Sequence, residues 1–126
     1  MDAREEVLTA TESLLKSIES ADWPEYTRLC AQDLTCFEPE AKGRLEHGID
    51  FHKQFFDQGG HMKGHSNTIL EPHVRLLGPD AAVVTYVRLA QGSGPDRRFE
   101  ETRVWQRTSE GWKHVHFHRS RVTTQP

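Results

Sequence analysis

The chain has 126 residues, with 16 Lys plus Arg against 19 Asp plus Glu, which gives a formal net charge of -3. This length suits one domain, residues 1–126, around one hydrophobic core. The charge balance lacks the basic excess of proteins that bind nucleic acid or anionic membranes. No apolar run reaches the roughly 18 residues of a membrane-spanning helix, and the acidic start MDAREEV has no apolar signal region, so we expect a soluble cytoplasmic protein.

Three helices are expected in the first half of the chain. Asp2 and Glu5 form a capping box in front of apolar residues that repeat at helical spacing. Asp22 and Glu25 form a second capping box, which opens the next helix. The third helix carries aromatic residues between positions 49 and 56, and two glycines should stop it at 59–60. The glycine-rich segment 59–64 reads as a loop near a pocket mouth or a subunit contact.

From about residue 65 onward the chain reads as strands separated by turn signals. Pro72 demands an edge position or a bulge within the first long strand. Helices followed by an antiparallel meander predict an α+β fold, with three helices packed on one face of a curved antiparallel sheet. A short strand is expected at 34–37, and the long strands at 67–77, 81–91, 97–107 and 112–122.

Helices on one side of the sheet leave its other face uncovered, and apolar side chains on that face need a partner. The strands hold more apolar side chains than one small core needs, and a second copy of the chain would cover the excess. The residues concerned are Val74, Leu76, Val83, Val87, Leu89 and Val104.

Cysteine and histidine are the residue types here that suggest metal or redox chemistry. Two cysteines are too few for a disulfide framework, so we expect buried thiols at Cys30 and Cys36. Simple alternation along the last strand puts His114, His116 and His118 on one face, opposite Val115, Phe117 and Arg119. Three such imidazoles bind zinc only with a fourth ligand. We favour packed interface histidines, which low pH would protonate, over a metal site.

Several motifs follow one another in unbroken order along nearly the whole chain. They are FEPEA at 37–41, ILEPHVRLLG at 69–78, YVRL at 86–89, FEETRVW at 99–105 and WKHVHFHRS at 112–120. Together they closely resemble the association, or hub, domain of calcium/calmodulin-dependent protein kinase II, a member of the nuclear transport factor 2-like superfamily. The resemblance implies a cone-shaped fold and an assembly role rather than an enzymatic one.

The resemblance also implies partners. Hub domains form dimers that close into rings by head-to-tail contacts, so we expect a homo-oligomer of ten or more subunits. In the kinases the hub holds catalytic domains at high local concentration. A chain of 126 residues has no room for a kinase domain, so that domain would be fused to the chain or a separate partner.

Hub domains contain a deep pocket, lined by arginines, that binds small carboxylates or acidic peptide groups. Carried over by motif, the pocket residues here are Arg88, Arg103, Arg119, His52 and Tyr86, with Glu38 as a countercharge. Physical chemistry supports this set, because converging guanidiniums need an acidic partner or a bound anion. Arginine also forms bidentate bonds to carboxylates. The alternative is three ordinary surface arginines lying along the sheet.

The pairing of the last two strands decides whether these arginines share a face. A register with Arg103 opposite Phe117 would place Arg103 and Arg119 together. A bulge next to Gly111 could produce that register, and a loop of different length would separate them. The sequence leaves both possibilities open.

Besides assembly and carboxylate binding, catalysis is a third hypothesis, because related cone-shaped folds include isomerases, dehydratases and cyclases. Glu38, His52 and Tyr86 could act there as base and proton donor. A pocket dominated by fixed positive charge keeps Glu38 ionised and makes it a weak base. We therefore favour binding over turnover, with no catalytic residue and no cofactor.

Overall fold

The computed structural model describes residues 1–58 and 65–123. The expected helix stop at 59–60, the loop at 59–64 and the last three residues lie outside the described residues. The elements within them, in chain order, are α1 (Ala3–Glu19), α2 (Trp23–Leu29), β1 (Cys30–Phe37), the 3-10 turn η1 (Pro39–Ala41), β2 (Glu46–His47), α3 (Asp50–Asp57), β3 (Ser66–Leu76), β4 (Ala81–Gln91), β5 (Arg97–Thr108) and β6 (Gly111–Arg121).

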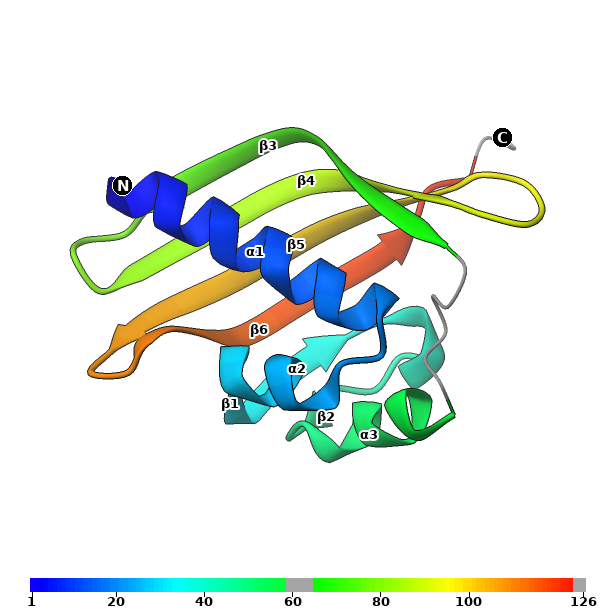
Figure 1. Cartoon of the computed structure of the whole chain (residues 1–126), viewed down its shortest axis with the longest axis horizontal. Coiled ribbons are helices and arrows are strands. Elements are labelled where there is room, and N and C mark those ends of the chain that lie inside the picture. The colour runs from blue at the N-terminus through cyan, green and yellow to red at the C-terminus, as the bar shows by residue number, and fades with distance from the viewer. Residues whose placement is uncertain (59–64, 124–126) are drawn as a thin grey trace.

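Both predicted capping boxes form at the helix starts. The Asp2 carboxylate accepts a hydrogen bond from the Glu5 backbone N–H at 2.9 Å, and the Asp22 carboxylate accepts one from the Glu25 N–H at 3.1 Å. These bonds satisfy N–H groups that a helix start leaves unpaired. Figure 1 shows α1 lying diagonally across the sheet, while α2 and α3 sit beside β1 and β2. The helices therefore cover one face, which we call the inner face; the opposite side is the outer face.

The fold class predicted from the sequence is confirmed. One six-stranded sheet runs in the order β2-β1-β6-β5-β4-β3, so the four long strands form the expected antiparallel meander. The pairing of β1 with β6 is parallel, which the expectation of an antiparallel sheet did not include. β1 also begins at Cys30, directly after α2, and is longer than the strand expected at 34–37. The added N-terminal part pairs with β6, where Cys30 lies opposite His114.

The predicted irregularity at Pro72 is present in β3. The register between β3 and β4 shifts between Leu70 and His73. Glu71 has φ 52, in the left-handed region that is uncommon outside glycine. A bulge of this kind bends the edge strand and interrupts its pairing, which accommodates a residue that has no backbone N–H.

A second bulge lies at Val115 in β6 and corrects the predicted grouping of the histidines. Val104 pairs with His116 but Trp105 pairs with His114, so one residue of β6 is left over. The expectation that the three histidines share a face is therefore wrong. His114 is fully buried and stacks on Phe117, at 5.5 Å between ring centroids, on the inner face. His116 and His118 remain on the outer face, by strand alternation.

The register left open by the sequence is resolved in favour of a shared face. Arg103 lies opposite Phe117 and Glu101 lies opposite Arg119, so the side chains of β5 and β6 meet on the inner side. The bulge that sets this phase is at Val115, not next to Gly111. Gly111 instead supplies a left-handed turn position with φ 101.

The apolar side chains predicted to be in excess divide between the two faces. Val74 and Leu76 pack against the core, so their assignment to a surplus was wrong. The others alternate with buried inner residues and lie half-buried on the outer face: Val83, Val87, Leu89 and Val104. Phe37, 38% exposed, stands beside His116 and His118 on the same side. The outer face thus keeps a partly exposed apolar centre.

The two cysteines are free and buried, as expected. Among the described residues, no helix has the length and apolar character needed to cross a membrane.

Candidate functional site

A cavity of about 120 Å³ lies between the inner face of the sheet and the helices. It is much smaller than the roughly 300–1,000 Å³ typical of drug-sized sites, so its dimensions suit a small ligand. Charged and aromatic side chains dominate its lining. The lining residues are Ile18, Tyr26, Glu38, Glu40, His52, Phe55, Phe56, Arg88, Arg97, Phe99, Arg103, Phe117 and Arg119.

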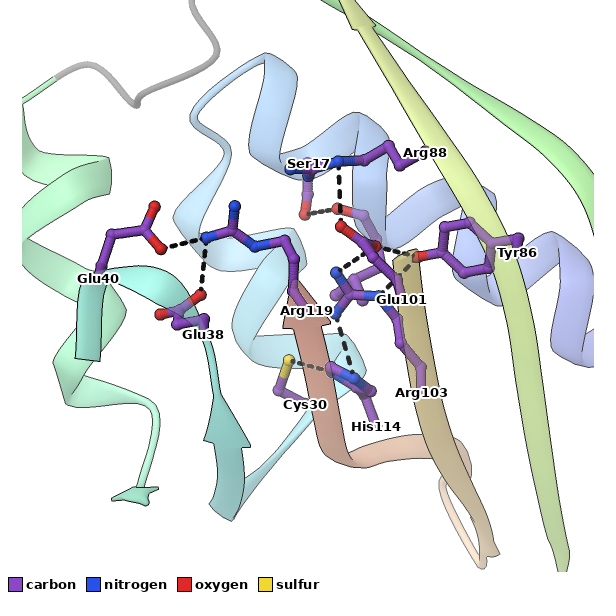
Figure 2. A network of polar contacts seen from close by, with 11 residues as sticks. Ser17, Cys30, Glu38, Glu40, Tyr86, Arg88, Glu101, Arg103, His114 and Arg119 are labelled. Carbon is purple, nitrogen blue, oxygen red and sulfur yellow. Dashed lines mark hydrogen bonds and ion pairs between the residues drawn. The ribbon is translucent and has the colours of Figure 1, made fainter. Parts of the chain in front are cut away.

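Glu101 is the anionic centre behind this lining. Its carboxylate lies 3.0 Å from Nη2 of Arg103 and 3.1 Å from Nε of Arg88, and its side chain is fully buried. The Tyr86 hydroxyl donates to the same carboxylate at 2.5 Å and accepts from Nε of Arg103 at 2.7 Å. Figure 2 shows these side chains pointing at Glu101, Tyr86 and Arg88 from β4 and Arg103 from β5, the strand of Glu101 itself. The network holds two guanidiniums in fixed orientations.

Arg119 belongs to a second ion-pair group, at the β1 side of the cavity. Its Nη2 donates to Oε2 of Glu38 at 3.2 Å and also to Glu40 (Figure 2). Oε1 of Glu38 lies 2.9 Å from Nε2 of His52, which comes from α3. Glu38 thus connects the end of β1, helix α3 and strand β6. Both Glu38 and His52 are buried, at 8% and 7% exposure.

Aromatic rings pack face-on against the guanidiniums of the cavity. Arg88 lies over the Phe99 ring at 4.7 Å and Arg119 lies over the same ring at 5.0 Å. Arg103 lies over Phe117 at 4.5 Å. Cation–π contacts of this kind stabilise a cation that has lost part of its hydration. The cavity therefore presents its positive charges on a rigid aromatic floor.

His114 completes the support of Arg103 from β6. Nη1 of Arg103 lies 3.3 Å from Nε2 of His114, and Nδ1 of His114 lies 3.6 Å from the Cys30 sulfur. A guanidinium only donates, so Nε2 is the acceptor and the proton of the neutral ring sits on Nδ1, facing Cys30. Burial, together with the Arg103 charge, holds the pKa of His114 well below its usual value.

The charges around the cavity do not cancel. Four arginines line it, and three carboxylates pair with them: Glu38, Glu40 and Glu101. One guanidinium charge is left over, and Arg97 is the arginine that has no carboxylate within 4 Å among residues 1–58 and 65–123. Burial lowers the pKa of Arg88, and the charges of Arg119 and Arg103 lower it further. An anionic ligand would relieve this repulsion.

The ionisable groups are poorly arranged for proton transfer. Burial alone would raise the pKa of Glu38, but the His52 contact and the Arg119 charge outweigh it, and the pKa falls below its usual value. The same balance, with Arg103 and Arg88 as the charges, lowers the pKa of Glu101. Burial raises the pKa of Tyr86. A strongly ionised carboxylate and a phenol that keeps its proton favour anion binding over acid–base catalysis.

The structure brings five of the six sequence-predicted site residues to the cavity. Tyr86 is the exception: it lies behind the lining, where it bonds Glu101 and Arg103. The sequence motifs did not lead us to predict Arg97 and the Phe99 ring as site residues, although strand alternation could have indicated them. Arg97, Phe99, Glu101 and Arg103 alternate along β5, which places them on one face.

The fold is that of the nuclear transport factor 2-like class. A structure described as an NTF2-like protein from Cytophaga hutchinsonii covers 97% of this chain and 100% of its own, with a TM-score of 0.82. Sequence identity is only 19%, so the likeness concerns the fold alone.

Sequence comparison is more specific. Residues 3–123 match the family described as the calcium/calmodulin dependent protein kinase II association domain, and the chain belongs to this family. It is 48% identical over 124 residues to the calcium/calmodulin-dependent protein kinase type II alpha chain of Drosophila melanogaster. The match covers 93% of this chain and 23% of the Drosophila protein. The chain spans about a quarter of the length of the curated relatives it matches.

A solved relative agrees in both sequence and shape. The CaMKII hub homology domain of Chlamydomonas reinhardtii is 40% identical to this chain, with a TM-score of 0.90. The match covers 98% of this chain and 100% of the other. The resemblance identified from the sequence motifs is thereby confirmed.

Proposed function

We propose that this chain is an assembly hub, whose copies form dimers that close into a ring of ten or more subunits. Membership of the association-domain family supports an oligomerisation role, as does the similarity to solved domains described as hubs. A closed ring follows from head-to-tail contacts whose rotation closes. The hub would gather kinase domains, fused to the chain or separate, at high local concentration.

The outer face of the sheet is the observation that carries this proposal. Val83 and Val104 form a cross-strand pair there, with Val87 and Leu89 further along β4. Helices cover only the inner face, so these side chains have no layer above them within the described chain. Burying such a face against a second copy removes apolar surface from water, worth about 25 cal/mol per Å².

A charge placed at the centre of this face tests the proposal. Val104→Lys should lower the native mass, because the interface would bury an unpaired ammonium. Gln106→Lys is the matched control, since it adds the same charge at an exposed position of the same strand and face. Circular dichroism establishes that both variants fold. Equal native masses for the two variants would contradict assembly through this face.

A second proposed function, compatible with the first, is the binding of a small carboxylate or acidic peptide group in the cavity. The uncompensated guanidinium charge favours it, together with the rigid setting of Arg88 and Arg103 and with Arg97, which has no ion pair among the described residues. Two parallel N–H···O bonds from one guanidinium match the geometry of a carboxylate. Turnover of the isomerase or cyclase type is the less favoured alternative, because Glu38 is held as an ion-paired carboxylate.

A further inference from the structure

Three side chains with metal-binding atoms meet where β1 ends beside α3. Cys36 lies in β1, Glu38 follows the strand by one residue, and His52 projects from α3. Nε2 of His52 lies 2.9 Å from Oε1 of Glu38 and 3.9 Å from Sγ of Cys36. The three donor atoms all lie within 4.8 Å of one another. The anion-binding hypothesis accounts for Glu38 and His52 but leaves Cys36 unexplained.

We propose that Cys36, Glu38 and His52 form a binding site for one zinc-like divalent metal ion. Zinc bonds of about 2.0–2.3 Å in a tetrahedron separate neighbouring donor atoms by roughly 3.3–3.8 Å. The separations from His52 to Glu38 and to Cys36, 2.9 Å and 3.9 Å, lie on either side of that range, and all three atoms lie within 4.8 Å of one another. Small side-chain rotations would therefore bring the three atoms to bonding distance.

The donor set selects the class of metal. A thiolate and an imidazole suit zinc and similar transition metals, whereas Ca²⁺ and Mg²⁺ require oxygen ligands. A coordinated thiol loses its proton, so Cys36 would release one proton to solvent. The thiolate and the Glu38 carboxylate together balance the two positive charges of the ion, while Glu40 remains as the ion-pair partner of Arg119. That neutrality matters at a place where the three residues are 1%, 8% and 7% exposed.

Neighbouring groups already orient two of the ligands. Arg119 donates to Oε2 of Glu38 at 3.2 Å, which leaves Oε1 directed at His52. The His52 ring packs 5.6 Å from Phe117 and 5.3 Å from Phe51, so its tilt is fixed. Its Nδ1 has no hydrogen-bond partner among the described residues, so the ring proton can move there when Nε2 takes the metal. A hydrogen bond to a ligating carboxylate, like the one from Arg119 to Glu38, is typical of metal sites.

The fourth coordination position would face the cavity. Glu38 and His52 both line it, whereas Cys36 approaches from the strand behind. Water or the carboxylate of a small ligand could therefore complete the tetrahedron. Three protein ligands with one open position is the arrangement of zinc sites that interact with small molecules.

Titration of the reduced, metal-stripped chain with Co²⁺ tests the proposal, because cobalt replaces zinc and its bond to a thiolate absorbs in the near ultraviolet. We expect this absorption to saturate at one Co²⁺ per chain and to disappear when Zn²⁺ is added. It should be lost in Cys36→Ser and in His52→Gln. Cys36→Ala serves if the serine variant does not fold.

Cys30→Ser is the matched control. Cys30 is equally buried and also contacts one histidine nitrogen, at 3.6 Å from His114. Among the described residues, however, it does not belong to a group of three possible metal ligands. The control should keep the full absorption. The proposal is overturned if the wild-type chain shows no thiolate band at excess Co²⁺, if the band survives in Cys36→Ser, or if it is lost in Cys30→Ser. Loss in His116→Gln with retention in His52→Gln would also overturn it, by moving the metal to the outer face.

Discussion

Arg103 and Glu101 stand two residues apart on β5 and form an ion pair of 3.0 Å, with side-chain exposures of 2% and 0%. The same carboxylate lies 3.1 Å from Arg88. One buried acid therefore fixes two of the cavity arginines. Buried pairs of this kind add little net stability, yet removing one partner leaves an uncompensated charge in a poorly solvated place.

Replacing this acid should be costly. Glu101→Gln should lower the free energy of unfolding by about 3–5 kcal/mol, because Arg103 and Arg88 lose their buried countercharge. Glu100→Gln, on the exposed side of the same strand, should change it by less than about 0.5 kcal/mol. Urea denaturation at one fixed protein concentration measures both values. A Glu101→Gln chain as stable as the Glu100→Gln chain would show that the network is not essential.

His114 should make stability depend on pH. Its folded-state pKa lies well below the usual 6.5, because of burial and the charge of Arg103. The unfolded chain therefore binds a proton below about pH 6.5 that the folded chain refuses, and stability falls as the pH falls. The groups facing the ring are Arg103 on β5, Cys30 on β1 and His52 on α3.

The measurement is the slope of the unfolding free energy between pH 7 and pH 5. His114 alone should contribute up to about 1.4 kcal/mol per pH unit. His114→Gln keeps a group that can accept from Arg103 but does not titrate, so its slope should be shallower by that amount. Parallel slopes for the two proteins would mean that folding does not lower the pKa of His114.

Arg97 offers the cleanest test of anion binding, because it lines the cavity and forms no ion pair with any residue that the structure describes. Succinate at constant ionic strength should raise the melting temperature of the wild-type chain, as any ligand specific to the folded state does. Arg97→Gln should reduce this shift several-fold. Arg98→Gln, one residue along on the outer face, should leave it unchanged. Equal shifts in both variants would remove Arg97 from the site.

The outer-face histidines predict an effect of acid on assembly. His116 and His118 lie beside Phe37 on this face, and burial with the charge of His118 lowers the pKa of His116. A neutral His116 packs at pH 8, whereas its protonation at lower pH would place charges in the interface. Native mass should therefore be lower at pH 5.5 than at pH 8, and less so in His116→Gln. An unchanged mass would reject this sensitivity.

Local signals were sufficient to predict most of the fold. The caps at Asp2 and Asp22 depend on residues three positions away, and strand β4 begins and ends where its turn residues indicate. The face of His114 was not predictable in this way. The bulge at Val115 arises where β6 passes Trp105 and Arg103 of another strand, so alternation along β6 alone gives the wrong side.

In the candidate site, too, some features could be predicted from the sequence and others could not. Arg88, Arg103 and Arg119 could be named from motifs, and their cavity position follows from strand register. The closeness of Cys36 to His52 could not be predicted, because a strand and a helix 16 residues apart meet only when α3 packs beside β1. Contacts between elements depend on the whole core, and no short window of sequence contains them.

Assembly of the chain is tested most directly by the native mass of the wild-type protein. Native mass spectrometry or light scattering at several protein concentrations should give ten or more times the 14.5 kDa of one chain. That value should persist on dilution if the interfaces close into a ring. A monomer or a plain dimer at every concentration would contradict the hub function.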